Sequence, residues 1–550
     1  MKPEHIRILS IDALSYWMLE RYLEEWELKN FQRMKREGAF AEGMIAPGPD
    51  ATTPPAHAAL FCGCVSEEHG IYSFEEPVIE NGIIHPWKKK LGFDATSLKA
   101  EPLWVSFLKS GRKVLLLHFP LSMPVEPYTC SACFGQDFSE NLVVLESFSQ
   151  RLASEFCRKD EPGDKTFTIT LSDNSKIILP SNAPEKPEVQ LFPSKLAGIL
   201  KMRFPSDTPE EPDFYFGTSI HKISCNHEEL AQNYFDTVGP FIGGGAVYSY
   251  WKDRLGNRIS RGGSGKAELR VFETLEKVAE HFLKAIQFGV QKVQPEAGFY
   301  YFHIIDLALH LWMGLLDPDC PGSSPDIRGF LLPLVRKTFV YADQAVGLLM
   351  EASGKNDLLA VVSDHGMSPI EKTFYPNQLF LEAGLLKWDF KKNEPILDQT
   401  YALYHQSNSG YIVINTEARG GVVKEESKET IIKKVYEVLS PFLGTALEKL
   451  EMVSEHPEIP ALGEIYLTPR YKVSLMSKVE GKIMESGHYG GQHHFWQESK
   501  PMQAVLMLKG PGVPAGANLG LRSHLEFAPT IAYLAGISKP DKARCARIRF

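Results

Sequence analysis

Short apolar runs that end close to an aspartate recur along the 550-residue chain. Three such runs are Ile6–Ile11, Phe299–Ile305 and Leu358–Val362. The aspartates that follow them are Asp12, Asp306 and, after one serine, Asp364. Nearly continuous apolar runs of this length are typical of central strands covered on both faces. Because helical patterns alternate with them, the sequence predicts an α/β fold with a mostly parallel central sheet flanked by helices.

Two long segments have a different character and are predicted to be insertions. Residues 135–265 contain Lys165–Leu179, which alternates with period two around an Asp-Asn-Ser turn and predicts a β-hairpin. We expect this first insertion to be β-rich and cap-like. The second, residues 375–487, contains a predicted strand at Gly410–Ile414 and a predicted helix at Lys428–Leu439. The remaining segments, 1–134, 266–374 and 488–550, would form one discontinuous core.

Composition narrows the class of protein. The formal net charge is −9, whereas general nucleic-acid binders carry a basic surplus, so we expect no nucleic-acid binding. Residues 299–316 have the length of a membrane span, but His303, Asp306 and His310 within them would be costly in a bilayer. We therefore predict a strand followed by a helix there, and no membrane span. The first residues lack a secretory-signal pattern, and we expect a cytoplasmic protein.

The three aspartates predict a shared site. In an open α/β sheet, ligands bind outside the carboxyl ends of the strands, so these carboxylates should face one crevice. His310 follows Asp306 by four residues, which places both on one face of a helix. His365 directly follows Asp364. Carboxylates and imidazoles are ligands for zinc and similar divalent ions, and a metal removes the repulsion between crowded carboxylates.

A threonine beside two prolines is a candidate nucleophile. The segment reads Thr52-Thr53-Pro54-Pro55-Ala56-His57. A hydroxyl attacks only if its pKa is lowered, and a bound divalent ion lowers the pKa of bound water from 15.7 to about 7. The composition alone favours a structural Pro-rich turn, and the nucleophile stays open as the alternative at this point.

Together these segments resemble the alkaline phosphatase superfamily, and within it the type I phosphodiesterase/nucleotide pyrophosphatase branch with its bacterial and archaeal phosphohydrolase/phosphomutase members. The most specific motif is Ser363-Asp364-His365-Gly366-Met367. The other matching segments, in chain order, are Ile8–Asp12, Thr53–His57, Cys62-Gly63, His69–Phe74, Leu103–Pro124, Asp306–Trp312, Gly491–His493 and Phe527–Thr530. The resemblance covers nearly the whole chain and implies an alkaline-phosphatase-like catalytic core with the two insertions.

The resemblance also implies two divalent metal ions, with zinc as the first choice and manganese as the alternative. Their ligands would be Asp306, His310 and His493 at one site, and Asp12, Asp364, His365 and the Thr53 hydroxyl at the other. Thr53 would attack phosphorus, and water would hydrolyse the resulting phospho-threonine. His488 is the alternative to His493, because His488, His493 and His494 lie close together in the sequence.

One position departs from the family pattern. Phe74 stands where the nucleotide pyrophosphatases have an asparagine that helps to hold the phosphoryl oxygens. Another donor must then take that role. Arg258, Arg261 and Lys266, in a Gly-rich part of the first insertion, are the candidates for substrate binding, and a solvated basic loop is the alternative interpretation.

The predicted function is a two-metal-dependent phosphohydrolase that acts on a small phosphate mono- or diester. A phosphomutase or phosphonate hydrolase that uses the same site is one alternative. A non-catalytic metal-binding or regulatory relative is another, and the complete ligand set argues against it.

Overall fold

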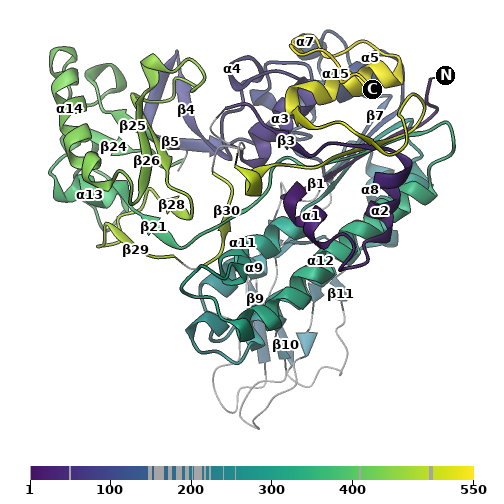
Figure 1. Ribbon diagram of the computed structural model, residues 1–550, viewed down its shortest axis with the longest axis horizontal. Helices are drawn as coiled ribbons and strands as arrows, with labels where there is room; N and C mark the ends of the chain where they lie inside the picture. The colour runs from purple at the N-terminus through teal and green to yellow at the C-terminus, as the bar shows by residue number, and fades with distance from the viewer. Residues whose placement is uncertain are drawn as a thin grey trace.

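A nine-stranded sheet forms the centre of the molecule (Figure 1). Its strands, in spatial order, are β16 (Ser224–Cys225), β7 (Leu142–Glu146), β6 (Val114–Leu117), β18 (Ala297–Phe302), β1 (Ile6–Ile11), β19 (Leu358–Val362), β31 (Leu506–Lys509), β2 (Ala39–Phe40) and β32 (Ala517–Asn518). The strands from β7 to β19 run parallel, whereas β31 and β16 are antiparallel to their neighbours. The predicted mostly parallel sheet is therefore confirmed.

The computed structural model describes residues 2–48, 51–146, 151–153, 166–170, 176–180, 189–192, 197–200, 202–203, 214–215, 219–221, 224–239, 241–243, 245–253, 255–407, 410–487, 489–494 and 499–550. All statements below refer to these residues.

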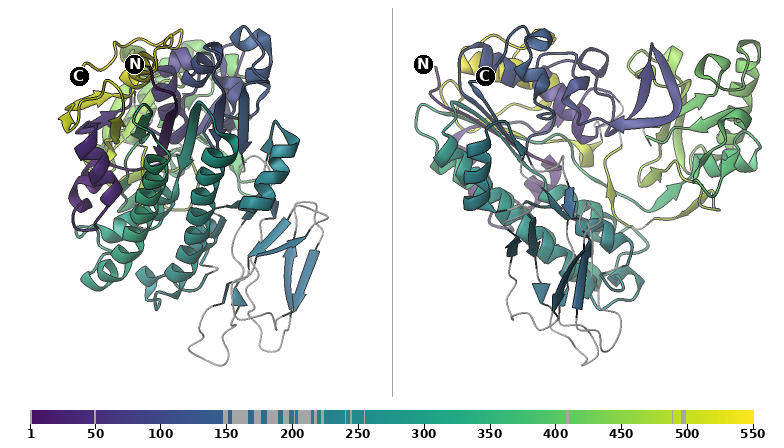
Figure 2. Two further views of the ribbon diagram at one scale, coloured as in Figure 1. Left: turned by 90° about the vertical axis from the view of Figure 1, so that its right-hand side faces the viewer. Right: turned by 180° about the vertical axis from the view of Figure 1, so that it is seen from behind.

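The sheet is covered on both faces, because successive side chains of a strand point to opposite sides. Leu9 and Ile11 of β1 enter one hydrophobic core, and Ile6 and Ile8 enter another. The first core is completed by α1 (Tyr16–Tyr22), α2 (Lys29–Glu37), α10 (Lys266–Phe288), α11 (Ile304–Leu316) and α12 (Pro325–Glu351). The second is completed by α3 (Thr53–Cys62), α5 (Leu103–Lys109) and α15 (Phe527–Ala535). Figure 2 shows the long helices of the first core side by side.

The apolar stretch at residues 299–316 is a strand followed by a helix, as predicted. However, β18 ends at Phe302, and α11 begins at Ile304, so the prediction of a strand through Ile305 is wrong. His303 leaves the extended conformation, with φ −115° and ψ 15°, and thereby starts the helix. Asp306 consequently lies in the first turn of α11 and not at a strand end. Among the described residues, no helix is long and apolar enough to cross a membrane.

A further hydrophobic core, separate from the two at the central sheet, gathers residues from Phe374 to Leu475. Figure 1 shows this part of the molecule to one side of the central sheet, and we call it the lobe at residues 375–487, with the boundaries as predicted. Its main sheet has the order β24 (Ala402–Tyr404), β25 (Tyr411–Ile414), β27 (Ile465–Pro469) and β26 (Leu447–Met452), and α14 (Lys428–Leu439) packs against it. The predicted strand and helix in this segment are confirmed. A hairpin of β4 (Glu75–Glu80) and β5 (Ile83–Leu91) reaches the lobe from the core, where the rings of Trp87 and Trp388 meet edge to face at 5.4 Å.

The first insertion contains the predicted hairpin, since β9 (Thr166–Thr170) pairs antiparallel with β10 (Lys176–Pro180). Both lie below the central sheet in Figure 1. The predicted boundary at residue 135 is too early, because β7 pairs in parallel with β6 and thus belongs to the central sheet. Strand β16, also inside the predicted range, extends the same sheet. The other boundaries of the proposed domains stay a prediction.

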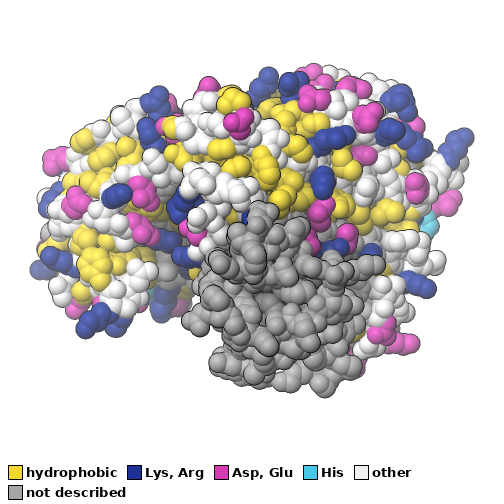
Figure 3. Space-filling model, turned by 90° about the horizontal axis from the view of Figure 1, so that it is seen from below, with side chains coloured by type: hydrophobic (Ala, Val, Ile, Leu, Met, Phe, Trp, Pro, Cys, Tyr) yellow, Lys and Arg dark blue, Asp and Glu magenta, His cyan; other side chains and the backbone are white. Residues whose placement is uncertain are grey.

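The face seen in Figure 3 carries both signs of charge, with Lys and Arg interspersed among Asp and Glu. This distribution matches the modest net charge of −9.

Candidate metal centre

The sheet and α11 bring the three predicted aspartates together. Asp12 follows β1 directly, and Asp364 follows the adjacent strand β19 after Ser363. The partner of β1 on its other side is β18, which leads into α11 and Asp306. One ligand atom each of Asp12, Asp306 and His365 lies within 4.8 Å of the others.

Asp306, His310 and His493 form the first group of candidate ligands. His310 Nε2 lies 3.2 Å from Asp306 Oδ1 and 3.2 Å from His493 Nε2. His493 Nε2 lies 3.8 Å from the same Asp306 oxygen. His310 Nδ1 donates to the carbonyl oxygen of Gly491 at 2.8 Å, so the Nδ1 atom carries the proton. When the ring is neutral, Nε2 is the unprotonated atom, and this is the form that binds a metal.

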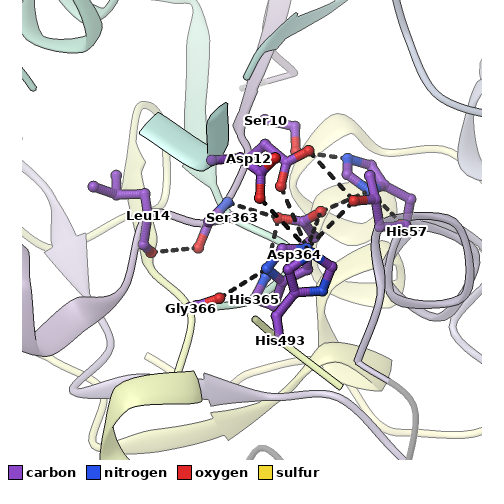
Figure 4. Close-up of polar contacts among 12 residues, drawn as sticks. Ser10, Asp12, Leu14, His57, Ser363, Asp364, His365, Gly366 and His493 are labelled. Atoms are coloured by element: carbon purple, nitrogen blue, oxygen red, sulfur yellow. Dashed lines mark hydrogen bonds and ion pairs between the residues drawn. The ribbon is translucent and has the colours of Figure 1, made fainter. Parts of the chain in front are cut away.

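Asp12, Asp364, His365 and Thr53 form the second group, shown in part in Figure 4. His365 Nε2 lies 3.3 Å from Asp12 Oδ1, 3.3 Å from Asp364 Oδ2 and 3.3 Å from Thr53 Oγ1. Thr53 Oγ1 also lies 3.4 Å from Asp12 Oδ2. His365 Nδ1 donates to the Gly366 carbonyl oxygen at 2.9 Å, which again leaves Nε2 for the cluster.

The two groups are direct neighbours. The rings of His365 and His493 stack with centroids 3.9 Å apart and an angle of 16° between their planes. His493 is 5% exposed, and the side chains of Asp306 and His310 are 13% and 25% exposed. The cluster is thus reached from solvent through the first group, while the second group is buried.

Burial and crowding shift the pKa values in this cluster. The pKa of Asp12 is well above its usual value because of burial and the nearby carboxylates Asp364 and Asp306. Burial also opposes ionisation of Asp364, but the imidazoles of His365 and His57 outweigh it and lower the pKa to about 2. Burial and the rings of His365 and His310 hold the pKa of His493 well below its usual value.

This donor set fits divalent metal ions. Asp12 Oδ1 and Asp306 Oδ1 are buried and have no hydrogen-bond donor among the described residues. Leaving such oxygens without a partner is costly, whereas a cation in contact with them removes both the missing interaction and the mutual repulsion. Mixed carboxylate and imidazole ligands suit zinc and manganese.

Thr53 is held at the start of α3, where the sequence explains the local structure. Pro54 and Pro55 occupy the first turn, in which a proline loses no hydrogen bond and fixes a helical φ. Thr53 is 4% exposed, and its carbonyl oxygen accepts a hydrogen bond from His57 Nδ1 at 2.8 Å. The hydroxyl is therefore fixed beside the second group.

The predicted substrate-binding residues have other contacts in the structure. Arg258 and Arg261 both bind Asp253, each at 2.7 Å, and Arg258 also lies over the Trp251 ring at 5.2 Å. Both arginines thus form ion pairs with Asp253, which lies five residues before Arg258, and their role in substrate binding stays a prediction. Lys266 is the first residue of α10.

Three further positions were singled out from the sequence. His488 lies outside the described residues. His494 is half-buried, and its ring stacks on His493 at 5.5 Å. Phe74 is 41% exposed and meets Phe93 edge to face at 5.2 Å.

Sequence reasoning missed Tyr301, whose hydroxyl donates to Asp12 Oδ2. Its signal is the parallel register of β18 and β1, which pairs Tyr301 with Ser10, two residues before Asp12. It also missed Ala13, which adopts φ 56° and turns its N–H toward Asp364 Oδ1 at 3.3 Å. A positive φ at alanine is uncommon, and here it directs a backbone donor at the cluster.

The comparison with protein families identifies a phosphohydrolase of the alkaline phosphatase superfamily. Residues 7–496 match the family model for type I phosphodiesterase / nucleotide pyrophosphatase, and this range includes every residue of the two groups. The protein belongs to this family, whose members are hydrolases that act on phosphoric ester bonds.

Solved structures share the fold. Murine ectonucleotide pyrophosphatase/phosphodiesterase 5 has a TM-score of 0.50 at 12% identity, with 99% of this chain and 98% of that chain covered. An inactive variant of the same murine protein, in complex with AMP, has the same TM-score of 0.50 and 12% identity, with 100% and 98% covered. No curated protein matches the chain.

Proposed function

We propose that this protein cleaves a phosphate mono- or diester with the help of two divalent metal ions and through a phospho-threonine on Thr53. The observation that carries the proposal is the position of Thr53 Oγ1, 3.4 Å from Asp12 Oδ2 and 3.3 Å from His365 Nε2. A buried hydroxyl fixed among metal-binding side chains is placed to act as a nucleophile.

Each of the two groups of candidate ligands would hold one metal ion. Asp306, His310 and His493 would hold one ion, and Asp12, Asp364, His365 and Thr53 the other. Two bound divalent ions lower the pKa of a hydroxyl and offset the charge on the attacking and leaving oxygens. Zinc is the first choice and manganese the alternative.

The chain itself positions the reacting hydroxyl. The bond from Thr53 Oγ1 to phosphorus forms while the bond from phosphorus to the leaving oxygen breaks, and water then cleaves the bond at Thr53. His57 holds the Thr53 backbone through the carbonyl oxygen, so the hydroxyl keeps its direction between the two steps. The small phosphate-ester substrate, the cytoplasmic location and the lack of a nucleic-acid partner stay predictions.

A phosphomutase or phosphonate hydrolase would use the same nucleophile and ligands. A non-catalytic metal-binding relative would have no need for a threonine hydroxyl aimed at the ligands, so the site favours an enzyme. We expect the first insertion and the lobe at residues 375–487 to determine which leaving group the enzyme accepts.

The test is a substrate panel run with zinc and with manganese. Metal-loaded protein should hydrolyse para-nitrophenyl phosphate or bis-para-nitrophenyl phosphate, and Thr53→Ala should lower kcat by at least a thousandfold. Thr53→Ser, which keeps a hydroxyl, should retain measurable turnover and a phosphorylated residue detectable by mass spectrometry. Turnover undiminished in Thr53→Ala would overturn the proposal.

A further inference from the structure

A pocket of about 940 Å³ lies between α1, α11 and α12. This volume is in the range of sites for small molecules. Among the described residues that line it, none is Thr53 or a proposed metal ligand. Residues near Pro369 and Pro501 complete its wall. The pocket is therefore separate from the metal centre.

One wall of the pocket is aromatic. Tyr16, Trp17 and Tyr22 of α1 line it. Tyr22 is held in place by Trp26, whose ring stacks on it with centroids 3.9 Å apart and planes 4° from parallel. Tyr16 and Tyr22 thus present ring surfaces to the pocket together with Trp17. Such a wall suits a flat aromatic ring.

The pocket has more positive than negative charge to offer a ligand. Two of its acidic side chains are already paired: Glu20 with Lys35 at 2.6 Å, and Asp317 with Lys472 at 2.6 Å. Asp319, a third acid, is 85% exposed.

Two cations of the pocket are left without such a partner. Arg328 donates to Ser323 Oγ at 2.8 Å, and neither Arg328 nor Lys500 has a carboxylate within ion-pair distance among the described residues. Guanidinium and ammonium groups with free donors bind phosphate, sulfonate or carboxylate groups. The charge pattern therefore favours an anionic ligand.

The pocket wall at Pro501 is hydrogen-bonded to the loop that follows His365. The carbonyl oxygen of Pro501 accepts from Met367 N at 3.1 Å, and that of Met502 accepts from Gly366 N at 2.9 Å. A Cβ at Gly366 would lie only 1.9 Å from the Pro501 oxygen, so the two backbones are in close contact. A shift of Pro501 must move this loop.

We propose that this pocket binds an aromatic anion, with its ring against Tyr16, Trp17 and Tyr22 and its charged group at Arg328 and Lys500, and that its occupancy alters the metal centre through Pro501. The binding stands on the pocket alone. The effect on turnover rests on the proposed function.

The binding test uses naphthalene-2-sulfonate and isothermal titration calorimetry on the full chain. The double variant Arg328→Ala/Lys500→Ala should bind it at least tenfold more weakly, whereas Arg328→Lys/Lys500→Arg should keep most of the affinity. Lys337→Ala is the matched control, because Lys337 lies on α12 but pairs with Glu276 at 3.3 Å. Uncharged naphthalene-2-sulfonamide and inorganic sulfate should each bind at least tenfold more weakly than the sulfonate. Equal affinity in the Arg328→Ala/Lys500→Ala variant and the unaltered protein would overturn the proposal.

The coupling test measures hydrolysis of bis-para-nitrophenyl phosphate. Naphthalene-2-sulfonate should change kcat at least twofold at constant KM, and the Arg328→Ala/Lys500→Ala variant should show no change. Competitive inhibition that persists in this variant would place the sulfonate at Thr53 and overturn the proposal. If the protein had no hydrolytic activity, calorimetry on Thr53→Ala would still decide the binding claim, so the two failures are distinguishable.

Discussion

His57 Nδ1 lies 3.3 Å from Asp364 Oδ2, and both side chains are fully buried. The same nitrogen donates to the carbonyl oxygen of Thr53, while Nε2 lies 2.8 Å from Ser10 Oγ on β1. One imidazole thus ties the nucleophile, a candidate metal ligand and the central strand together. His57 is a positioning residue by this geometry, since it acts through Thr53 and Asp364.

We expect His57→Ala to lower kcat by at least tenfold and to weaken metal binding, because neither Thr53 nor Asp364 keeps its orientation. His57→Asn, which can still donate to the Thr53 carbonyl oxygen, should recover part of kcat. The measurements are steady-state kinetics and metal content by mass spectrometry. His456→Ala is the control, because His456 lies in the lobe at residues 375–487 and pairs with Glu458. A His57→Ala protein with the kinetics of the control would contradict this role.

The sequence predicts the elements of the site better than their junctions. Asp12 and Asp364 could be placed because each follows an apolar strand, and adjacent parallel strands end at one edge. The sequence predicts Asp306 at a strand end, because Ile304 and Ile305 continue the apolar run of β18. In the structure these two residues already belong to α11. The apolar composition of this segment does not show where the buried strand ends and the buried helix begins. The backbone conformation of His303 sets that boundary.

Contacts between distant segments are harder to predict. The hydrogen bond from Tyr301 to Asp12 could not be predicted from the sequence. It depends on which strands are neighbours and on the register in which they pair. The ion pairs of Arg258 and Arg261 with Asp253 could not be predicted from spacing alone. The His493 assignment came from a family pattern, and the structure adds its contacts with His310 and Asp306.

Tyr301→Phe should weaken metal binding by about tenfold, because loss of a hydrogen bond to a ligating carboxylate typically costs 10–100-fold in affinity. The hydroxyl of Tyr301 donates to Asp12 Oδ2 and helps to hold this carboxylate. Tyr300→Phe removes the same atom one residue earlier, on the opposite face of β18, and should leave the affinity unchanged. Competition with a fluorescent chelator measures both constants. Equal affinities of the two variants would exclude the role of Tyr301.

Metal removal should destabilise the protein, and Asp12→Asn should reverse part of that loss. Without metal, burial and the neighbouring Asp364 and Asp306 disfavour the charge on Asp12, which is why its pKa is raised. The amide carries no charge, so the metal-free variant should have a higher Tm than the metal-free unaltered protein. With saturating zinc the order should invert, because ligand binding to the folded state stabilises only the protein that keeps the site. Differential scanning fluorimetry with and without a chelator gives the four Tm values, and a lower Tm for metal-free Asp12→Asn would refute the repulsion argument.

The buried pair of histidines around Tyr234 should make stability depend on pH. Tyr234 Oη lies 2.8 Å from His118 Nε2 and 2.9 Å from His281 Nε2, and it joins α8 (Glu228–Val238) to α10 and to the residue that follows β6. Burial, with a smaller contribution from Lys284, lowers the pKa of His281 to about 3.

An unfolded histidine titrates near pH 6.5, so below that pH the unfolded state binds a proton that folded His281 does not. The stability that neutral His281 contributes is fully present above about pH 6.5 and falls as the pH drops, by up to about 1.4 kcal/mol per pH unit. Between pH 6.5 and pH 5 this amounts to a loss of about 2 kcal/mol.

His281→Gln cannot titrate, so its free energy of unfolding in urea should fall by about 2 kcal/mol less over this interval than that of the unaltered protein. His456→Gln, at a site that is one-third exposed, should follow the unaltered protein. If His281→Gln and His456→Gln lost the same stability between these pH values, His281 would not be the source of the pH dependence.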